Sequence, residues 1–189
     1  NSWLSWLRGG SAMAAISACA GFGAICGSSI ATASTMGRVA LPELLKFNYS
    51  ISLATGVLAA GGVLGILIPP SIVLIIYALI VEVNNVYMFD AALIPGLLAI
   101  CLFLATIAIF VAIYPDAAPK TRKTDKEERM RATIGILPVA SVFFIVLGGM
   151  YAGFFNPTPA ASLGVGLVLI IGYVTKKLNL TQLKEALLE

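Results

Sequence analysis

One apolar segment of the chain reads Gly61-Gly62-Val63-Leu64-Gly65-Ile66-Leu67-Ile68-Pro69-Pro70-Ser71. It lies in a charge-free run from Ile51 to Ile80, which as one helix would be about 45 Å long, against roughly 30 Å of bilayer hydrocarbon. Each proline lacks an amide donor and displaces the carbonyl four residues earlier, so the pair frees the carbonyls of Gly65 and Ile66. We therefore predict a membrane helix over residues 51–80 that is broken into two halves near residues 65–71.

Composition extends the membrane interpretation to the whole chain. Of the 189 residues, 59% are hydrophobic and 11% are charged, whereas a soluble domain carries roughly a quarter charged residues. The charges cluster and leave further uncharged runs over residues 9–37, 91–115 and 132–175. About 20 apolar residues cross a bilayer as a helix, so each run corresponds to one membrane segment or to a pair of them. The sequence predicts an all-α, polytopic integral membrane protein.

The run over residues 9–37 is rich in Ala, Gly, Ser and Thr, with Gly27-Ser28-Ser29 at its centre. Small residues let helix backbones approach closely, whereas a lipid-facing helix carries larger apolar side chains. The central glycine and hydroxyls favour a chain reversal. Such a re-entrant hairpin is tolerated where it is buried in protein or lines a water-filled cavity. We predict a re-entrant helical hairpin over residues 9–37; the alternative is a small-residue helix face packed on a neighbour.

The remaining segments follow from charge, proline and aromatic positions. We expect an interfacial segment (1–8), the hairpin (9–37), a connection at the cytoplasmic interface (38–50), the broken helix (51–80), a transmembrane helix (91–115), a basic cytoplasmic loop (116–131), two transmembrane helices (132–151 and 160–175) and an interfacial amphipathic helix (176–189). The chain has no initiator methionine and stops within a helix-like stretch, so we expect both ends to be internal points of a longer protein.

The basic residues set the orientation. With a re-entrant hairpin and four crossings, all 12 Lys and Arg residues fall on one face of the bilayer, and only Glu82 and Asp90 fall on the other. The positive-inside rule makes the basic face, with the loop at residues 120–131, cytoplasmic. Because the basic residues flank membrane segments, the net charge of +3 indicates the lipid bilayer as a partner and no nucleic acid.

Missing residue types exclude several classes of function. The chain contains no histidine, which excludes histidine zinc sites, Ser-His triads and histidine proton relays within it. No Asp or Glu lies within the apolar runs, so an intramembrane enzyme would lack its base or its paired acids. The cysteines Cys19, Cys26 and Cys101 lack C-x-x-C spacing and are interpreted as small buried residues. We predict that the protein is not an enzyme and has no cofactor other than a coupling ion.

The centre of the hairpin is the first candidate binding site. If the chain reverses there, a new helix begins with free amide groups and the positive end of its dipole, which suit a carboxylate. The helix that ends there offers unpaired carbonyls, which suit sodium. We predict substrate contacts from Ser28, Ser29, Ile30 and Thr32.

The proline pair marks the second candidate site, because freed carbonyls suit an alkali cation and hard cations prefer oxygen ligands. We predict that sodium is held, mainly through backbone carbonyls, by Gly27, Gly65, Ile66, Pro69 and Ser71. Two helix interruptions in one short stretch favour a transporter, because broken helices in transporters mark binding sites. The alternatives are a plain proline kink, a structural membrane subunit, or a channel or pore subunit with a re-entrant segment.

These stretches resemble a known family, the large membrane (DctM-like) subunit of tripartite ATP-independent periplasmic (TRAP) transporters. The resemblance covers most of the chain in order and spacing, and its motifs are Gly27 to Ala33, Ala40 to Glu43, Ala59 to Ser71 and Asn156 to Ala161. Val63 stands where a Thr is common in the family, and Pro159 where a Glu is common.

The resemblance implies one inverted repeat of an elevator-type transporter in the inner (plasma) membrane. It implies sodium-coupled symport of a carboxylate solute of the C4-dicarboxylate, keto acid or sugar acid class. It further implies two protein partners, a small membrane subunit (DctQ-like) and a periplasmic solute-binding protein (DctP-like). The second hairpin, the second broken helix and the arginine expected to hold the substrate carboxylate are not in this sequence.

Overall fold

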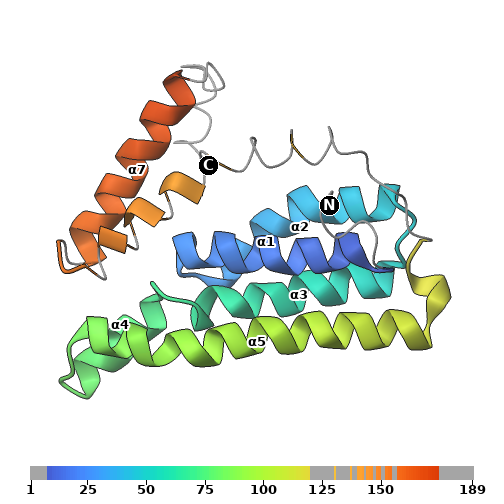
Figure 1. Cartoon of the computed structure of the whole chain (residues 1–189), viewed down its shortest axis with the longest axis horizontal. Helices are drawn as coiled ribbons and strands as arrows, with labels where there is room; N and C mark the ends of the chain where they lie inside the picture. The colour runs from blue at the N-terminus through green and yellow to red at the C-terminus, as the bar shows by residue number, and fades with distance from the viewer. Residues whose placement is uncertain are drawn as a thin grey trace. The chain divides into compact units, whose positions relative to one another are not determined.

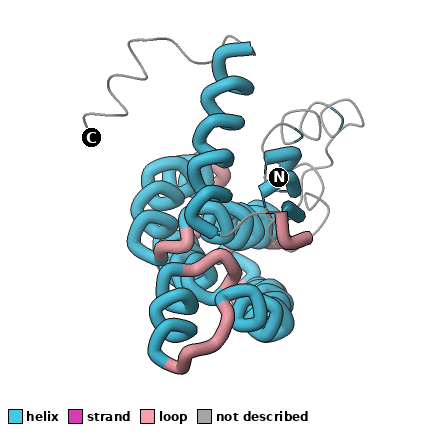
Figure 2. Tube along the Cα trace, turned by 90° about the vertical axis from the view of Figure 1, so that its left-hand side faces the viewer, coloured by secondary structure: helices cyan, strands magenta, loops and turns pink. Residues whose placement is uncertain are grey.

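The computed structural model describes residues 8–119 and, beyond them, residues 130, 137, 140–142, 144–146, 148, 149, 152–154 and 157–174. The chain divides into two compact units, before and after the bond between Arg129 and Met130. Within the residues just given, every regular element is a helix and none is a strand (Figure 2). The predicted all-α fold class is therefore confirmed for this part of the chain.

The first unit is a bundle of long helices with a short one at its end (Figure 1). Its elements are α1 (Gly10–Cys26), α2 (Ser29–Lys46), α3 (Ile51–Leu67), α4 (Ile72–Ile80), α5 (Asn85–Ile113) and the 3-10 helix η1 (Pro115–Ala117). Helices α1 and α2 both pack on α3, and α3 and α1 pack on α5, while α4 lies beside the beginning of α5. The second unit contains α7 (Pro157–Val174).

Side-chain caps explain where three of these helices begin. The Ser28 hydroxyl accepts a hydrogen bond from the Ala31 amide at 3.4 Å, and the Ser50 hydroxyl accepts one from the Leu53 amide at 3.3 Å. The Asn84 side chain accepts one from the Val86 amide at 2.9 Å. Each bond satisfies an amide that the first turn of a helix leaves without a partner.

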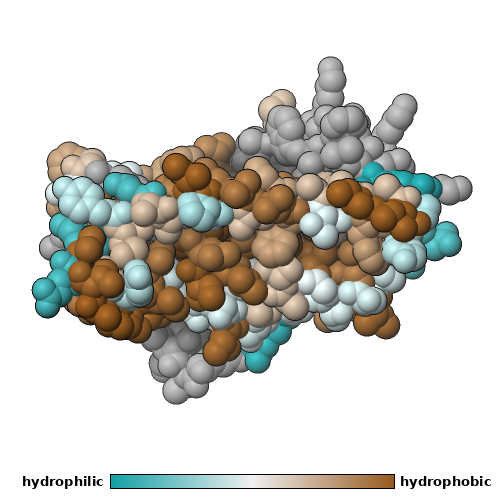
Figure 3. Space-filling model, turned by 90° about the horizontal axis from the view of Figure 1, so that it is seen from below, coloured by the Kyte–Doolittle hydropathy of each residue, from teal (hydrophilic) through white to brown (hydrophobic). Residues whose placement is uncertain are grey.

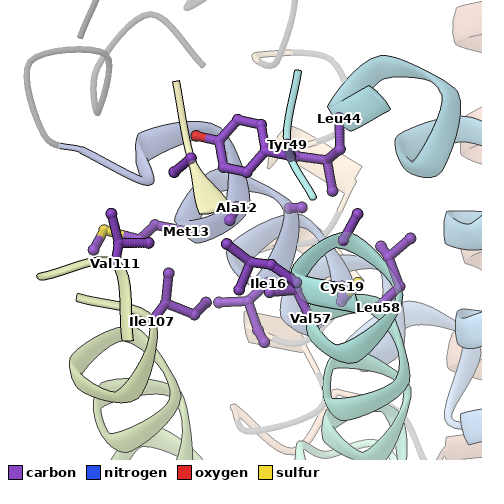
Figure 4. Close-up of a cluster of buried hydrophobic side chains, with 14 of the residues drawn as sticks. Ala12, Met13, Ile16, Cys19, Leu44, Tyr49, Val57, Leu58, Ile107 and Val111 are labelled. Carbon is purple, nitrogen blue, oxygen red and sulfur yellow. The ribbon is translucent and has the colours of Figure 1, made fainter. Parts of the chain in front are cut away.

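The buried core lies where α1, α3 and α5 meet (Figure 4). Ile16 of α1, Val57 of α3 and Val111 of α5 are all buried there. Tyr49, in the α2–α3 connection, is 5% exposed, and its hydroxyl accepts a hydrogen bond from the Ser11 amide at 3.1 Å. The neighbouring Ser50 amide donates to the Ala117 carbonyl at 3.0 Å. These bonds tie the start of α1 and the end of η1 to the α2–α3 connection.

Apolar residues cover most of the face of the first unit that Figure 3 shows. Within the described residues, two segments are long and apolar enough to cross a membrane, Ile51–Ile80 and Asn85–Ile113. Large side chains on α4 and α5 stay exposed, among them Ile80 at 73% and Ile94 at 74%. Burial of such surface away from water is worth roughly 25 cal/mol per Å². The exposed apolar face fits the predicted helical membrane protein.

Several element boundaries differ from the sequence predictions. Helix α2 continues to Lys46, although we expected a connection from residue 38. The reason is that its charges do not stop the helix: Lys46 pairs with Glu43 at 3.0 Å within the last turn. Helix α5 begins at Asn85 rather than at residue 91, because the Asn84 cap starts the helix and Asp90 stays exposed on its surface. Charge-free runs therefore do not set these two boundaries.

The second unit is described in part. Helix α7 begins at Pro157, three residues before the span we expected over 160–175, and proline is favoured in the first turn of a helix. Of the span predicted over 132–151, the described residues 137, 140–142, 144–146, 148 and 149 are helical. The predictions for residues 1–7, for the basic loop at 120–131 except Met130, and for 176–189 lie outside the described residues.

Candidate functional site

Helices α1 and α2 form a hairpin whose tip is Gly27-Ser28. Gly27 has a φ of 62°, in the left-handed region that favours glycine, and its amide donates to the Gly23 carbonyl at 2.7 Å. Ser28 is extended and Ser29 opens α2. The chain therefore ends one helix and starts the next within two residues, at the position where the sequence predicted a reversal.

The proline pair separates α3 from α4. Helix α3 ends at Leu67, where the Ile68 amide still donates to the Leu64 carbonyl at 3.0 Å, and α4 begins at Ile72. The prolines have no amide to offer the carbonyls of Gly65 and Ile66. The interruption is narrower than predicted, because Gly65 and Ile66 keep their helical conformation and lose only their hydrogen-bond donors.

The hairpin tip and the break between α3 and α4 are in direct contact. The Ile72 amide donates to the Gly27 carbonyl at 3.4 Å. A methyl group on Gly27 would lie 2.8 Å from the Pro70 carbonyl oxygen and 3.4 Å from Ser71 Cα. The structure thus brings the two sequence-predicted sites together through their backbones.

Three glycines of α3 allow this approach, because α3 packs against both arms of the hairpin. A methyl on Gly61 would lie 2.6 Å from Cys19 Sγ of α1, and one on Gly62 would lie 2.9 Å from Ala33 Cβ of α2. A methyl on Gly65 would lie 2.6 Å from Thr32 Oγ1. No side chain fits at these distances, so the small-residue composition of residues 9–37 is explained by close packing on α3.

Two polar residues are buried among those whose burial is described, and both lie at this contact. Thr32 is 0% exposed, and its hydroxyl donates to the Ser28 carbonyl at 2.7 Å. Ser71 is 1% exposed and precedes the first residue of α4, yet its hydroxyl has no hydrogen-bond partner among the described residues. A buried hydroxyl without a partner costs about 1–3 kcal/mol, so such a group points to a ligand.

The other predicted site residues divide into two groups. Ser29, Ile66 and Pro69 are buried or half-buried and lie beside the contact in sequence. Ile30 is 81% exposed, so its side chain does not take part in the contact between the hairpin tip and the break. Ile30 is the second residue of α2, one residue beyond Ser29.

Sequence reasoning missed a residue on the other side of the break. A methyl on Gly96 of α5 would lie 3.4 Å from the Leu67 carbonyl oxygen and 3.4 Å from Ile68 Cγ1. These are ordinary contact distances, so Gly96 marks where α5 packs on the end of α3, and a larger side chain would also fit there. The only signal in the sequence is the Pro95-Gly96 pair within an otherwise apolar run.

Comparison with known proteins places the chain in a family. The family described as "Tripartite ATP-independent periplasmic transporter, DctM component" matches residues 1–189. The C4-dicarboxylate TRAP transporter large permease protein DctM of Vibrio cholerae is 39% identical over 163 residues, which cover 84% of this chain and 35% of the relative. The protein of the same name from Pseudomonas aeruginosa is 32% identical over 190 residues, covering 100% of this chain and 44% of the relative.

A third relative is named for a different solute. The ectoine/5-hydroxyectoine TRAP transporter large permease protein UehC of Ruegeria pomeroyi is 34% identical over 170 residues, covering 90% of this chain and 39% of the relative. The chain thus spans less than half the length of these relatives. All three are named as transporter permeases and none as an enzyme, in agreement with the sequence prediction. The chain belongs to the DctM family, the large permease subunits of TRAP transporters.

Proposed function

We propose that the chain forms one half of the binding site of a sodium-coupled permease that takes up an organic acid across the inner membrane. The observation that carries the proposal is the contact between the hairpin tip and the broken helix around the unpartnered Ser71 hydroxyl. Carbonyls without intrahelical donors and the beginning of a helix meet there. The carbonyl oxygens suit a cation, and the amide groups at the beginning of the helix suit an anion.

Sodium would be held by neutral oxygens. The Gly65 and Ile66 carbonyls have no donor four residues later, because Pro69 and Pro70 carry no amide hydrogen. The Gly27 carbonyl accepts one long bond, of 3.4 Å, and retains a second lone pair. The Ser71 hydroxyl supplies a further oxygen. Oxygen ligands released from helices in this way suit an alkali cation.

The carboxylate would bind at the start of α2. The Ser28 hydroxyl caps the Ala31 amide, which leaves the Ser29 and Ile30 amides without a partner among the described residues and so open to a carboxylate. The helix dipole adds a favourable interaction of about 0.3–1 kcal/mol. Sodium at the Gly27 carbonyl and a carboxylate at the Ser29 amide would be neighbours, so each charge would raise the affinity for the other.

The position of the break along α5 supports a hairpin tip that stays within the membrane. Helix α1 has 17 residues, or about 26 Å. Helix α5 has 29 residues, or about 44 Å, and Gly96, which touches the break, lies about 26 Å from its end at Ile113. The tip would therefore lie well inside the span of α5. With the basic residues on the cytoplasmic side, the hairpin would open toward the cytoplasm.

The partners follow from the family. A tripartite transporter implies a small membrane subunit and a periplasmic solute-binding protein beside the large permease. The relatives are named for C4-dicarboxylates and for ectoine. We propose an organic acid as the solute, because the beginning of α2 suits a carboxylate.

The test is uptake by the full-length transporter in proteoliposomes, assembled with its small subunit and binding protein. We expect a labelled C4-dicarboxylate or other organic acid to accumulate when sodium is outside, and accumulation to stop when an ionophore collapses the sodium gradient. Equal uptake in potassium or choline would refute sodium coupling. Ion conductance without solute accumulation would favour the channel alternative.

A further inference from the structure

Thr32 is placed where a solute cannot reach it. The sequence predicted Thr32 as a substrate contact, but its side chain is 0% exposed, behind the hairpin tip. Its hydroxyl donates to the Ser28 carbonyl at 2.7 Å. A direct contact with the solute would therefore require the tip to open.

The Thr32 hydroxyl does more than make a bond within α2. Both the Thr32 amide, at 3.1 Å, and the Thr32 hydroxyl, at 2.7 Å, donate to the Ser28 carbonyl, so both lone pairs of that oxygen are engaged. The same hydroxyl oxygen lies 2.6 Å from the position that a Gly65 methyl would take. The Ser28 carbonyl oxygen lies 2.9 Å from the same position, so the hydroxyl and the carbonyl that it bonds pack together on the last turn of α3.

We infer that Thr32 is a positioning residue whose hydroxyl sets the spacing between the hairpin tip and the end of α3. This inference rests on the proposed function, because that spacing aligns the Gly27 carbonyl and the Ser71 hydroxyl with the freed carbonyls of Gly65 and Ile66. Thr32 itself contacts neither sodium nor solute. Loss of the Thr32 hydroxyl misplaces the sodium ligands without removing any of them.

Three substitutions of Thr32 in the full-length transporter separate the hydroxyl from the methyl group. Thr32→Ser keeps the hydroxyl and removes the methyl, Thr32→Val replaces the hydroxyl with a second methyl, and Thr32→Ala removes both groups without adding an atom. In proteoliposomes we expect Thr32→Val and Thr32→Ala to raise the sodium concentration for half-maximal uptake about tenfold, or ~1.4 kcal/mol. The maximal rate at saturating sodium should stay near wild type, and Thr32→Ser should restore the wild-type sodium dependence.

The matched control is Thr106→Val on α5. The Thr106 hydroxyl makes the same kind of bond, to the Leu102 carbonyl at 2.8 Å, but on an exposed face. It should leave the sodium dependence unchanged. If Thr32→Val does not assemble in the membrane, Thr32→Ala carries the test, because it introduces no new atom.

The possible results separate the inference from the proposed function. If the wild-type transporter takes up solute without any sodium dependence, the proposed function fails. If the wild type depends on sodium and Thr32→Ala has the same sodium dependence, the positioning role is refuted. A raised KM for the solute at unchanged sodium affinity would also refute it, because that result assigns Thr32 to the solute.

Discussion

Gly65→Ala is the substitution whose cost can be worked out most directly from the structure. The added methyl would lie 2.6 Å from Thr32 Oγ1 and 2.9 Å from the Ser28 carbonyl oxygen. Ordinary contacts begin near 3.4 Å, so the backbone of the hairpin tip has to move. Overpacking of this kind costs about 1–3 kcal/mol.

The opposing term is the helix preference of alanine over glycine, about 0.5–1 kcal/mol. Gly56, on the same helix, has no described residue within 4 Å of an added methyl, so Gly56→Ala gains this preference without a clash. We therefore expect the two variants to differ by about 1–3 kcal/mol, with Gly65→Ala the less stable.

The assay is thermal unfolding of the purified full-length transporter in detergent, followed by sodium-driven uptake in proteoliposomes. Gly65→Ala should unfold at a lower temperature than Gly56→Ala and should need more sodium for half-maximal uptake. If both variants unfold at the same temperature and share one sodium dependence, α3 is not packed against the hairpin tip as the structure has it.

Three further substitutions test other parts of the account in the full-length transporter. Ser29→Phe should abolish uptake at normal expression, because a bulky side chain at the start of α2 blocks the carboxylate; unchanged uptake would rule out this position. Replacing Pro69 and Pro70 with Ala together returns donors to the Gly65 and Ile66 carbonyls and should raise the sodium requirement for uptake about tenfold or more; an unaltered requirement would count against the freed carbonyls as ligands. Tyr49→Phe removes the acceptor of the Ser11 amide and should destabilise the protein by about 1 kcal/mol in thermal unfolding, with sodium affinity unchanged. A changed sodium affinity would show that the α2–α3 connection affects the sodium site.

The helix interruptions could be predicted because they follow from local covalent properties. Pro69 and Pro70 lack amide hydrogens wherever the chain places them, and Gly27 adopts a left-handed conformation at little cost. The all-α membrane class was equally predictable, because clustered charges and long apolar runs admit few alternatives. The family membership rested on the same stretches and is confirmed by the comparisons.

The contact between the interruptions could not be predicted, because it depends on packing between distant segments. Nothing near Gly65 shows that Thr32 lies opposite it, and nothing near Tyr49 points to Ser11, 38 residues earlier. Ile30 was predicted as a site residue from its place beside the tip, but the rotation of α2 leaves it 81% exposed. The sequence around a residue can show where a helix starts, but it does not show which side chains face the neighbouring helix.

The most direct test of the central claim is the sodium affinity of a Ser71→Ala variant of the full-length transporter, measured by sodium-dependent thermal stabilisation. Without sodium, the variant should be as stable as the wild type or more stable, because it no longer buries an unpartnered hydroxyl, which costs about 1–3 kcal/mol. With sodium, it should need about tenfold more of the ion to reach half of the maximal stabilisation. A variant that binds sodium as tightly as the wild type would contradict a sodium site at the contact between the hairpin tip and the broken helix.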